Sequence, residues 1–126
     1  MAELYTPYRF TPNVVRQEVE SDTAGSYVLG VDAGDGNFAP CYVGRSDHRV
    51  QGRLAKHDYL YKYEYFVYRT ASGAEQAFRQ ECELWHGYRQ RGYELDNKVH
   101  PAVPPGCALK CPFCDFANHM SALRVN

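Results

Sequence analysis

The sequence has no long apolar run, little net charge and no internal repeat. Without a run of about 18 apolar residues, a membrane-spanning helix is excluded. The N-terminal MAELYTPYRF has neither a basic stretch nor an apolar core, so we expect no secretory signal and a cytoplasmic location. The formal net charge of -1 excludes binding to polyanions by bulk charge. Any affinity for nucleic acid must therefore come from a local basic face.

What the sequence does contain is 126 residues, a length that suits one domain with one core, and eleven tyrosines. Tyrosine combines an apolar ring with a hydroxyl that needs a partner, so it suits strands, interfaces and polar pockets. With no export signal, the five cysteines are expected to be reduced. Three of them, Cys107, Cys111 and Cys114, lie within eight residues, which indicates a metal site rather than a disulfide framework.

The pattern of apolar and turn-forming residues predicts an α/β (α+β) fold: a small, largely antiparallel three-stranded sheet flanked by helices. Residues 26–31 and 41–44 are typical of strands, and the Gly- and Asp-rich loop between them makes a hairpin. A helix is expected from Ser46 or Asp47. The alternating tyrosines over 59–68 then predict the strongest strand of the chain.

A longer helix is expected after a Ser72 cap and should run to about Tyr88. Its apolar row contains one carboxylate, Glu81. A carboxylate that faces a core must be paired, protonated or bound to a metal. Taken alone, however, the residue pattern favours a glutamate at the helix edge whose head reaches water.

We divide the chain into three segments. Residues 1–24, which are interrupted by prolines, are expected to be an N-terminal extension packed on the domain, with a short helix or strand at 13–20. Residues 25–97 form the predicted domain. Apolar periodicity is lost from Gly92 onwards, and residues 98–126 are expected to be a cysteine-rich tail with a zinc site.

Two tripeptides on the predicted hairpin carry a family resemblance. Residues 25–27 (GSY) and 42–44 (YVG) resemble the two motifs that name the GIY-YIG nuclease family. Taken alone, Tyr27 and Tyr42 would indicate only cross-strand aromatic pairing. The resemblance covers residues 25–97, and the downstream positions that follow the family in order are Arg45, Arg53, His57 and Glu81.

The resemblance implies a metal-dependent endonuclease that hydrolyses DNA phosphodiester bonds, with RNA left open as a substrate. Glu81 would hold Mg²⁺ or Mn²⁺, hard cations that favour carboxylate oxygen and water. Arg53 would bind the scissile phosphate through its planar fork. Either Tyr27, with its pKa lowered by nearby cations, or His57 would take the proton from the attacking water. Tyr42 would orient Tyr27 or the phosphate.

Three further residues are implied as substrate-binding: Gly44, Arg45 and Asn97. Arg45 would contact the nucleic-acid backbone. Asn97 is the candidate for the family's asparagine beyond the glutamate helix, although it lies farther along the chain than is typical. Ser26 replaces the usual aliphatic middle residue of the first motif. Its side chain should point away from the adjacent tyrosine, so we expect little effect on catalysis.

The three clustered cysteines fit a structural zinc ion, since soft thiolates at short spacing bind it well. We expect His119 to be the fourth ligand, with His100 as the alternative. The same spacing matches the cluster-binding motif of radical SAM enzymes, but those carry it early, ahead of a large barrel. The CPFC sequence resembles a glutaredoxin redox pair, which opens a helix after the first strand of its fold. Unliganded cysteines are the remaining alternative.

Three functions therefore compete. The first is a metal-dependent endonuclease with a structural zinc tail, and the second is a non-catalytic DNA-binding or adaptor module on the same fold. The third is a radical or redox enzyme built on the cysteines. The set of tyrosine, arginine, histidine and glutamate favours the endonuclease, whereas the near-neutral charge keeps the non-catalytic module open.

Overall fold

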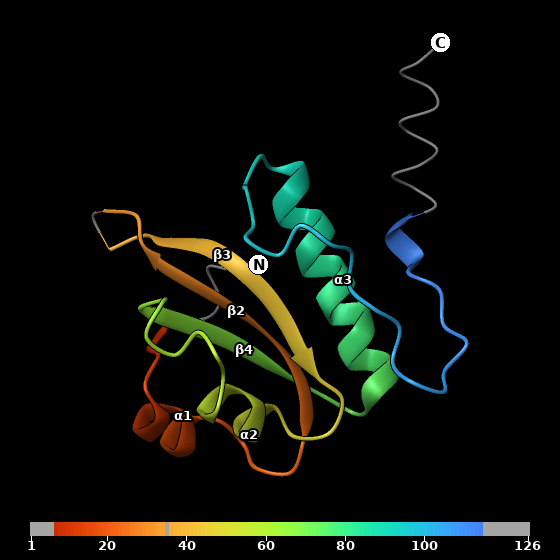
Figure 1. Cartoon of the computed structure of the whole chain (residues 1–126), viewed down its shortest axis with the longest axis horizontal. Coiled ribbons are helices and arrows are strands. Elements are labelled where there is room, and N and C mark those ends of the chain that lie inside the picture. The colour runs from red at the N-terminus through yellow and green to blue at the C-terminus, as the bar shows by residue number, and fades with distance from the viewer. Residues whose placement is uncertain (1–6, 35, 115–126) are drawn as a thin grey trace.

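A four-stranded antiparallel sheet, with the strand order β1-β4-β2-β3, organises the chain (Figure 1). The computed structural model describes residues 7–34 and 36–114. In chain order the elements are β1 Tyr8–Arg9, α1 Pro12–Glu18, β2 Ala24–Asp32, β3 Phe38–Ser46, α2 Val50–Ala55, β4 Tyr65–Ala71 and α3 Ala74–Gln90. In this part of the chain, no helix has both the length and the apolarity that crossing a membrane would require.

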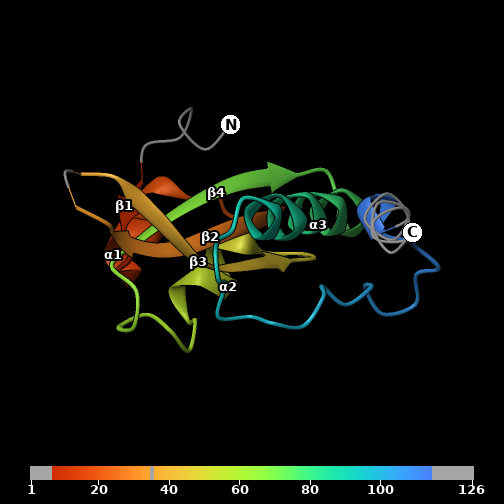
Figure 2. The same ribbon diagram turned by 90° about the horizontal axis from the view of Figure 1, so that it is seen from above.

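The two faces of the sheet are covered by different helices (Figures 1 and 2). Alternate residues of β2 point to opposite faces, as the pleat of a strand requires. Tyr27 and Leu29 pack with α1 and α2 in one core cluster. Val28 packs with Trp85 and Tyr88 of α3 in another. Two separate apolar layers, one on each face, therefore hold the helices against the sheet.

The predicted α+β class and the order of hairpin, helix, strand and helix are confirmed. The three-stranded sheet is wrong. The predicted N-terminal extension contributes β1, which pairs with β4 and becomes the fourth strand. The short helix or strand expected at 13–20 is a helix, α1, which Pro12 begins and Thr11 caps.

Three element boundaries differ from the prediction. The strand expected over 59–68 begins only at Tyr65, because residues 59–62 form turns in which Tyr61 is 91% exposed. The helix expected from residue 46 begins at Val50, and the hydroxyl of Ser46 instead accepts the backbone N–H of Arg49 in the preceding turn. The cap of α3 is Gly73 rather than Ser72.

Ser26 points away from Tyr27, as predicted. Its hydroxyl is fully buried on the α3 face and donates to Oε1 of Gln80 at 2.8 Å. Gln80 in turn donates to the backbone carbonyl of Thr70 at 3.0 Å. The polar residue that replaces an aliphatic one is therefore satisfied inside the core, as buried hydroxyls generally must be.

The outer edge of the sheet is covered by the segment that follows α3. Leu95 is buried, and the Asp96 N–H donates to the carbonyl of Cys41 at 2.6 Å. The side-chain amide of Asn97 pairs with both backbone groups of Val43, at 2.7 and 3.2 Å. The edge strand β3 is thereby protected from pairing with another chain.

We predict that Gly44→Ala lowers the free energy of unfolding by about 1–3 kcal/mol, a usual cost of overpacking. Gly44 lies opposite Tyr27 in the hairpin, and a Cβ there would come within 2.5 Å of Cζ and Oη of the tyrosine. Gly87→Ala is the matched control, because a Cβ on that helical residue meets nothing within 4 Å. The control should be neutral or stabilising by about 1 kcal/mol. Urea unfolding measures both variants, and equal midpoints would contradict the proposed packing.

Candidate functional site

Tyr27, at the centre of the sheet, is the middle of the candidate site. Its side chain is 1% exposed, and its Oη lies 3.0 Å from Nε2 of His57, two residues after α2. The Tyr27 and His57 rings meet edge-on, with centroids 5.5 Å apart. Tyr42 of β3 contacts the same histidine ring at 5.5 Å. Three residues that were predicted separately thus form one aromatic group.

The partners of His57 determine which of its nitrogens carries the proton. Nδ1 accepts the backbone N–H of Tyr59 at 3.1 Å, so the neutral ring has its proton on Nε2. Burial and the charge of Arg53 lower the pKa of His57, so the neutral ring is the prevailing form near pH 7. Nε2–H therefore donates its hydrogen bond to the Tyr27 oxygen.

The pKa of Tyr27 is raised to about 12. Burial is the main cause, and the guanidinium of Arg53 opposes it. The prediction that nearby cations lower this pKa is therefore wrong for the chain by itself, because desolvation outweighs them. Burial also raises the pKa of Tyr42. Both tyrosines are neutral phenols near pH 7.

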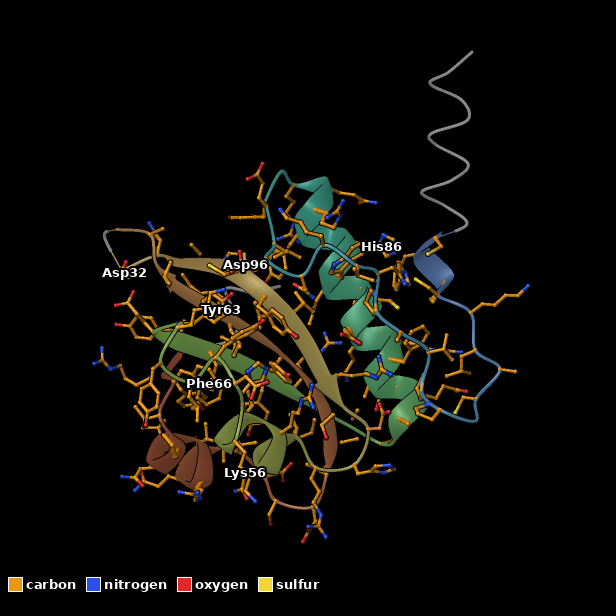
Figure 3. The ribbon with its side chains drawn as sticks, in the orientation of Figure 1. Asp32, Lys56, Tyr63, Phe66, His86 and Asp96 are labelled. Carbon is orange, nitrogen blue, oxygen red and sulfur yellow. The ribbon has the colours of Figure 1, made fainter. Side chains whose placement is uncertain are left out.

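A polar pocket of about 150 Å³ opens beside His57. Its lining residues are Tyr42, Arg53, Lys56, His57, Asp58 and Tyr59. Arg53 comes from the last turn of α2, and Lys56, which directly follows that helix, is labelled in Figure 3. Among the residues that the structure describes, Arg53 has no ion-pair partner within 4.0 Å. The pocket thus combines two cations and one carboxylate, that of Asp58, with aromatic rings.

Glu81 is 8% exposed, so its head does not reach freely into water as the residue pattern favoured. Its Oε1 accepts from Nη1 of Arg45 at 2.6 Å, and Nε of Arg45 also donates to Asp47 at 2.7 Å. Burial raises the pKa of Glu81, and the Arg45 guanidinium opposes that rise. The carboxylate thus meets the requirement that a buried charge be paired.

Arg45 is held between two carboxylates, with its guanidinium 5.4 Å from the centre of the Phe78 ring. Its predicted contact with a nucleic-acid backbone would have to compete with these ion pairs. Residue 45 follows Gly44 on β3 and points to the α3 face, which explains why it meets Glu81. In this structure the Arg45 guanidinium therefore binds Glu81 and Asp47.

The structure brings the five predicted catalytic residues into one electrostatic environment. Glu81 raises and Arg53 lowers the pKa of both Tyr27 and Tyr42, and Arg53 also lowers the pKa of Glu81. His57 completes the set through Tyr27. These side chains come from β2, β3, α2, the turn after α2, and α3.

Asn97 lies at the sheet edge, where its amide binds both backbone groups of Val43. Val43 stands between Tyr42 and Gly44 in the second motif. These bonds hold the strand that carries the motif. Asn97 is thus a positioning residue here, and its predicted contact with substrate would require the amide to leave the strand.

A second cluster lies between α3 and the tail. It contains His86, His100, Cys111 and Cys114, and one ligand atom of each lies within 4.8 Å of all the others. Such a group could bind a metal such as zinc. Of the predicted ligands, Cys107 is exposed and lies outside this group, and His119 lies outside the described residues.

His86 has no place in the linear spacing that predicts the zinc tail, because it lies far upstream on α3. The available indication is its position four residues after Cys82, which puts both side chains on one side of the helix. Cys82 is buried against Cys111. That side of α3 is therefore the one on which the tail packs.

Comparisons of the chain with protein-family models, with curated proteins and with solved structures gave no match. The function must therefore be argued from the arrangement of these side chains and their chemistry.

We predict that the free energy of unfolding falls as the pH decreases below about 6.5, the pKa of an unperturbed histidine. The pKa of His57 is lowered in the folded chain, so the unfolded chain takes up this proton first. The loss should level off below the folded-state pKa. His57→Gln should show a smaller fall between about pH 7 and about pH 5 in urea unfolding. His48→Gln, at an exposed position, is the control, and a pH dependence that only this control reduced would contradict the assignment.

Proposed function

We propose that this chain is a metal-dependent endonuclease of the GIY-YIG type, which hydrolyses phosphodiester bonds of DNA. The observation that carries the proposal is that the Tyr27 hydroxyl lies 3.0 Å from Nε2 of His57, while the charges of Arg53 and Glu81 both shift the pKa of this tyrosine. Phosphodiester hydrolysis needs an activated water, neutralised charge at phosphorus and a stabilised leaving oxygen. The side chains of this site offer candidates for the first two needs: a base for the water, and an arginine and a metal ligand that would neutralise charge at phosphorus.

Glu81 would hold the Mg²⁺ or Mn²⁺ ion, which supplies charge neutralisation at the phosphate when bound. One carboxylate is a suitable protein donor for Mg²⁺, which usually keeps several of its waters. Only Oε1 of Glu81 accepts from Arg45. Burial raises the pKa of Glu81, and the Arg45 guanidinium opposes that rise.

Tyr27 is the better candidate for the base. His57 carries its proton on Nε2 and donates to the Tyr27 oxygen, so it has no lone pair to offer on that side. Burial raises the pKa of Tyr27 to about 12, so the tyrosine would have to lose its proton once metal and substrate are bound. The donor from His57 and the charge of Arg53 both favour that phenolate. Arg53 would also bind the phosphate, using the guanidinium that lines the pocket.

The pocket favours nucleic acid as the substrate. Arg53 and Lys56 outnumber the one carboxylate of the pocket, that of Asp58, and so provide local positive charge in a chain whose formal net charge is -1. Tyr42 and Tyr59 line the same pocket and offer ring faces on which a base can stack. This combination of cations and rings is what an acidic polymer with aromatic bases requires.

One observation favours a second function, a non-catalytic DNA-binding or adaptor module. The Arg45–Glu81 ion pair neutralises the carboxylate that would hold the metal ion. A module of this kind would bind DNA equally well with and without chelator and would never cut it. Incubating supercoiled plasmid with the protein and Mg²⁺, with and without chelator, separates the two functions.

We predict that Glu81→Ala abolishes cutting of supercoiled plasmid that depends on Mg²⁺ or Mn²⁺, because the metal would lose its protein ligand. Glu81→Gln keeps the size of the side chain and should be equally inactive, which guards against loss of folding from an unpaired Arg45. Glu83→Ala is the control, because Glu83 is an exposed glutamate two residues further along α3. This variant should cut plasmid at the wild-type rate. If a folded Glu81→Gln protein cut plasmid at the wild-type rate, the assignment of Glu81 to the active site would be wrong.

We predict that Arg53→Ala slows cleavage far more than it weakens binding. A donor to charge that grows in the transition state is worth on the order of 3 kcal/mol, or roughly 100-fold in rate. Binding to a labelled duplex, measured by fluorescence anisotropy in chelator, should fall much less. Arg49→Ala is the control, since that exposed arginine lies just before the same helix. Equal losses in rate and affinity would make Arg53 a contact for the DNA backbone only.

A further inference from the structure

The chain carries a second set of side chains that the proposed nuclease chemistry does not use. His86 projects from α3 towards the C-terminal segment (Figure 3). His100, Cys111 and Cys114 reach the same point from that segment, and one ligand atom of each residue lies within 4.8 Å of all the others. Residues distant in the sequence thus place two imidazoles and two thiols together.

The spacing of these atoms fits a tetrahedral zinc ion. Zn–N and Zn–S bonds of about 2.0 and 2.3 Å put neighbouring ligand atoms roughly 3.3–3.8 Å apart. Sγ of Cys114 lies 3.0 Å from Nε2 of His100 and 3.6 Å from Nε2 of His86. Only small side-chain shifts are needed to close the four atoms around one ion.

His100 is already oriented as a ligand. Its Nδ1 lies 2.8 Å from the carbonyl oxygen of Pro101, which can only accept, so Nδ1 carries a proton. In the neutral ring the lone pair is then on Nε2, the nitrogen that faces Cys114. A backbone carbonyl that holds the other nitrogen of a histidine is the usual outer partner of a zinc ligand.

An apolar shell surrounds the four side chains. The Trp85 ring contacts His86 at 5.0 Å and His100 at 5.2 Å between centroids. Phe113, between the two cysteines in sequence, lies 6.2 Å from the His86 ring. Cys111 is buried against Phe78 and Cys82. Such a shell limits the access of water and favours a closed, structural metal site.

We propose that His86, His100, Cys111 and Cys114 bind one structural zinc ion that fastens the C-terminal segment to α3. Two thiolates with two neutral imidazoles are a donor set typical of structural zinc. Residues 91–111 contain no helix or strand, so regular backbone structure does not secure this segment. The metal supplies free energy that the packing of such a short irregular segment lacks. This proposal is independent of the nuclease function.

Cys107 separates this site from one built on the three clustered cysteines alone. It is exposed and its backbone N–H forms a turn with Pro104, outside the four-residue group. A zinc ion held as we propose does not need Cys107 and needs His86. A zinc ion held within the tail alone needs Cys107 and does not need His86.

The full chain, purified without added metal, should contain about one equivalent of zinc by elemental analysis. Cys107→Ser should retain that zinc, whereas Cys114→Ser and His86→Asn should each lose most of it. Trp85 is the one tryptophan in the chain, and it touches both histidines. Its fluorescence should therefore change when zinc is returned to the metal-free wild-type protein, and not in His86→Asn. Circular dichroism of each variant separates loss of metal from loss of the fold.

Three results would overturn the proposal. One is a wild-type protein, folded by circular dichroism, that neither contains zinc nor takes up added zinc. The second is a folded His86→Asn protein that keeps its zinc while Cys107→Ser loses it. The third is a brown protein with stoichiometric iron and sulfide, which would make the cysteines iron–sulfur ligands. The test does not measure plasmid cutting. The zinc proposal can therefore be confirmed or rejected even if the protein is not a nuclease.

Discussion

The contact between the Tyr27 ring and the bare backbone of Gly44 is the constraint on which the candidate site depends. The phenol occupies the space that any side chain at residue 44 would take. This packing requires the register in which Tyr27 is opposite Gly44. A slip of one residue in β3 would turn its side chains to the wrong faces. In the observed register the Tyr27 hydroxyl lies 3.0 Å from Nε2 of His57.

The alternation of β3 also explains how one strand serves both faces of the sheet. Gly44 leaves room for Tyr27 on the α2 face, and Arg45, the next residue, points to α3 and pairs with Glu81. The cation of Arg53 and the carboxylate of Glu81 come from helices on opposite faces, yet both shift the pKa of Tyr27. A glycine and an arginine in succession are therefore a structural requirement of the site as well as a motif.

The sequence was most informative where local periodicity and long-range packing agree. The hairpin and α3 follow from patterns that the tertiary structure leaves unchanged. The burial of Glu81 does not, because the pattern favoured a carboxylate that reaches water, whereas the residue is 8% exposed. The alternating tyrosines predicted the strand correctly only from Tyr65. Before that point Tyr59 lies in a turn, and its ring packs edge-on against the ring of Tyr63. β1 could not be predicted, since two residues contain no period and gain their structure only from β4.

The residues of the candidate sites also divide into those that the sequence indicates and those that depend on long-range packing. The resemblance of the motifs to a nuclease family predicted Tyr27, Arg53, His57 and Glu81 as site residues. The balance between burial and charge at Tyr27, however, depends on packing that no linear pattern contains. His86 is the clearest case. Short spacing identifies ligands that are neighbours in the chain, whereas a ligand from a distant helix becomes visible only after the tail has folded against that helix.

Helix α3 ties the two proposed metal sites together. Glu81 offers a hard carboxylate, and His86, little more than one turn later, joins a softer set of thiols and imidazoles. Mg²⁺ and Zn²⁺ differ in the ligands they prefer, so the two sites need not compete for one ion. Cys82, between these residues, is buried against Cys111, and Glu81 is paired with Arg45. Because a helix rotates as a unit, fastening the tail to one side of α3 also restricts the direction in which Glu81 points.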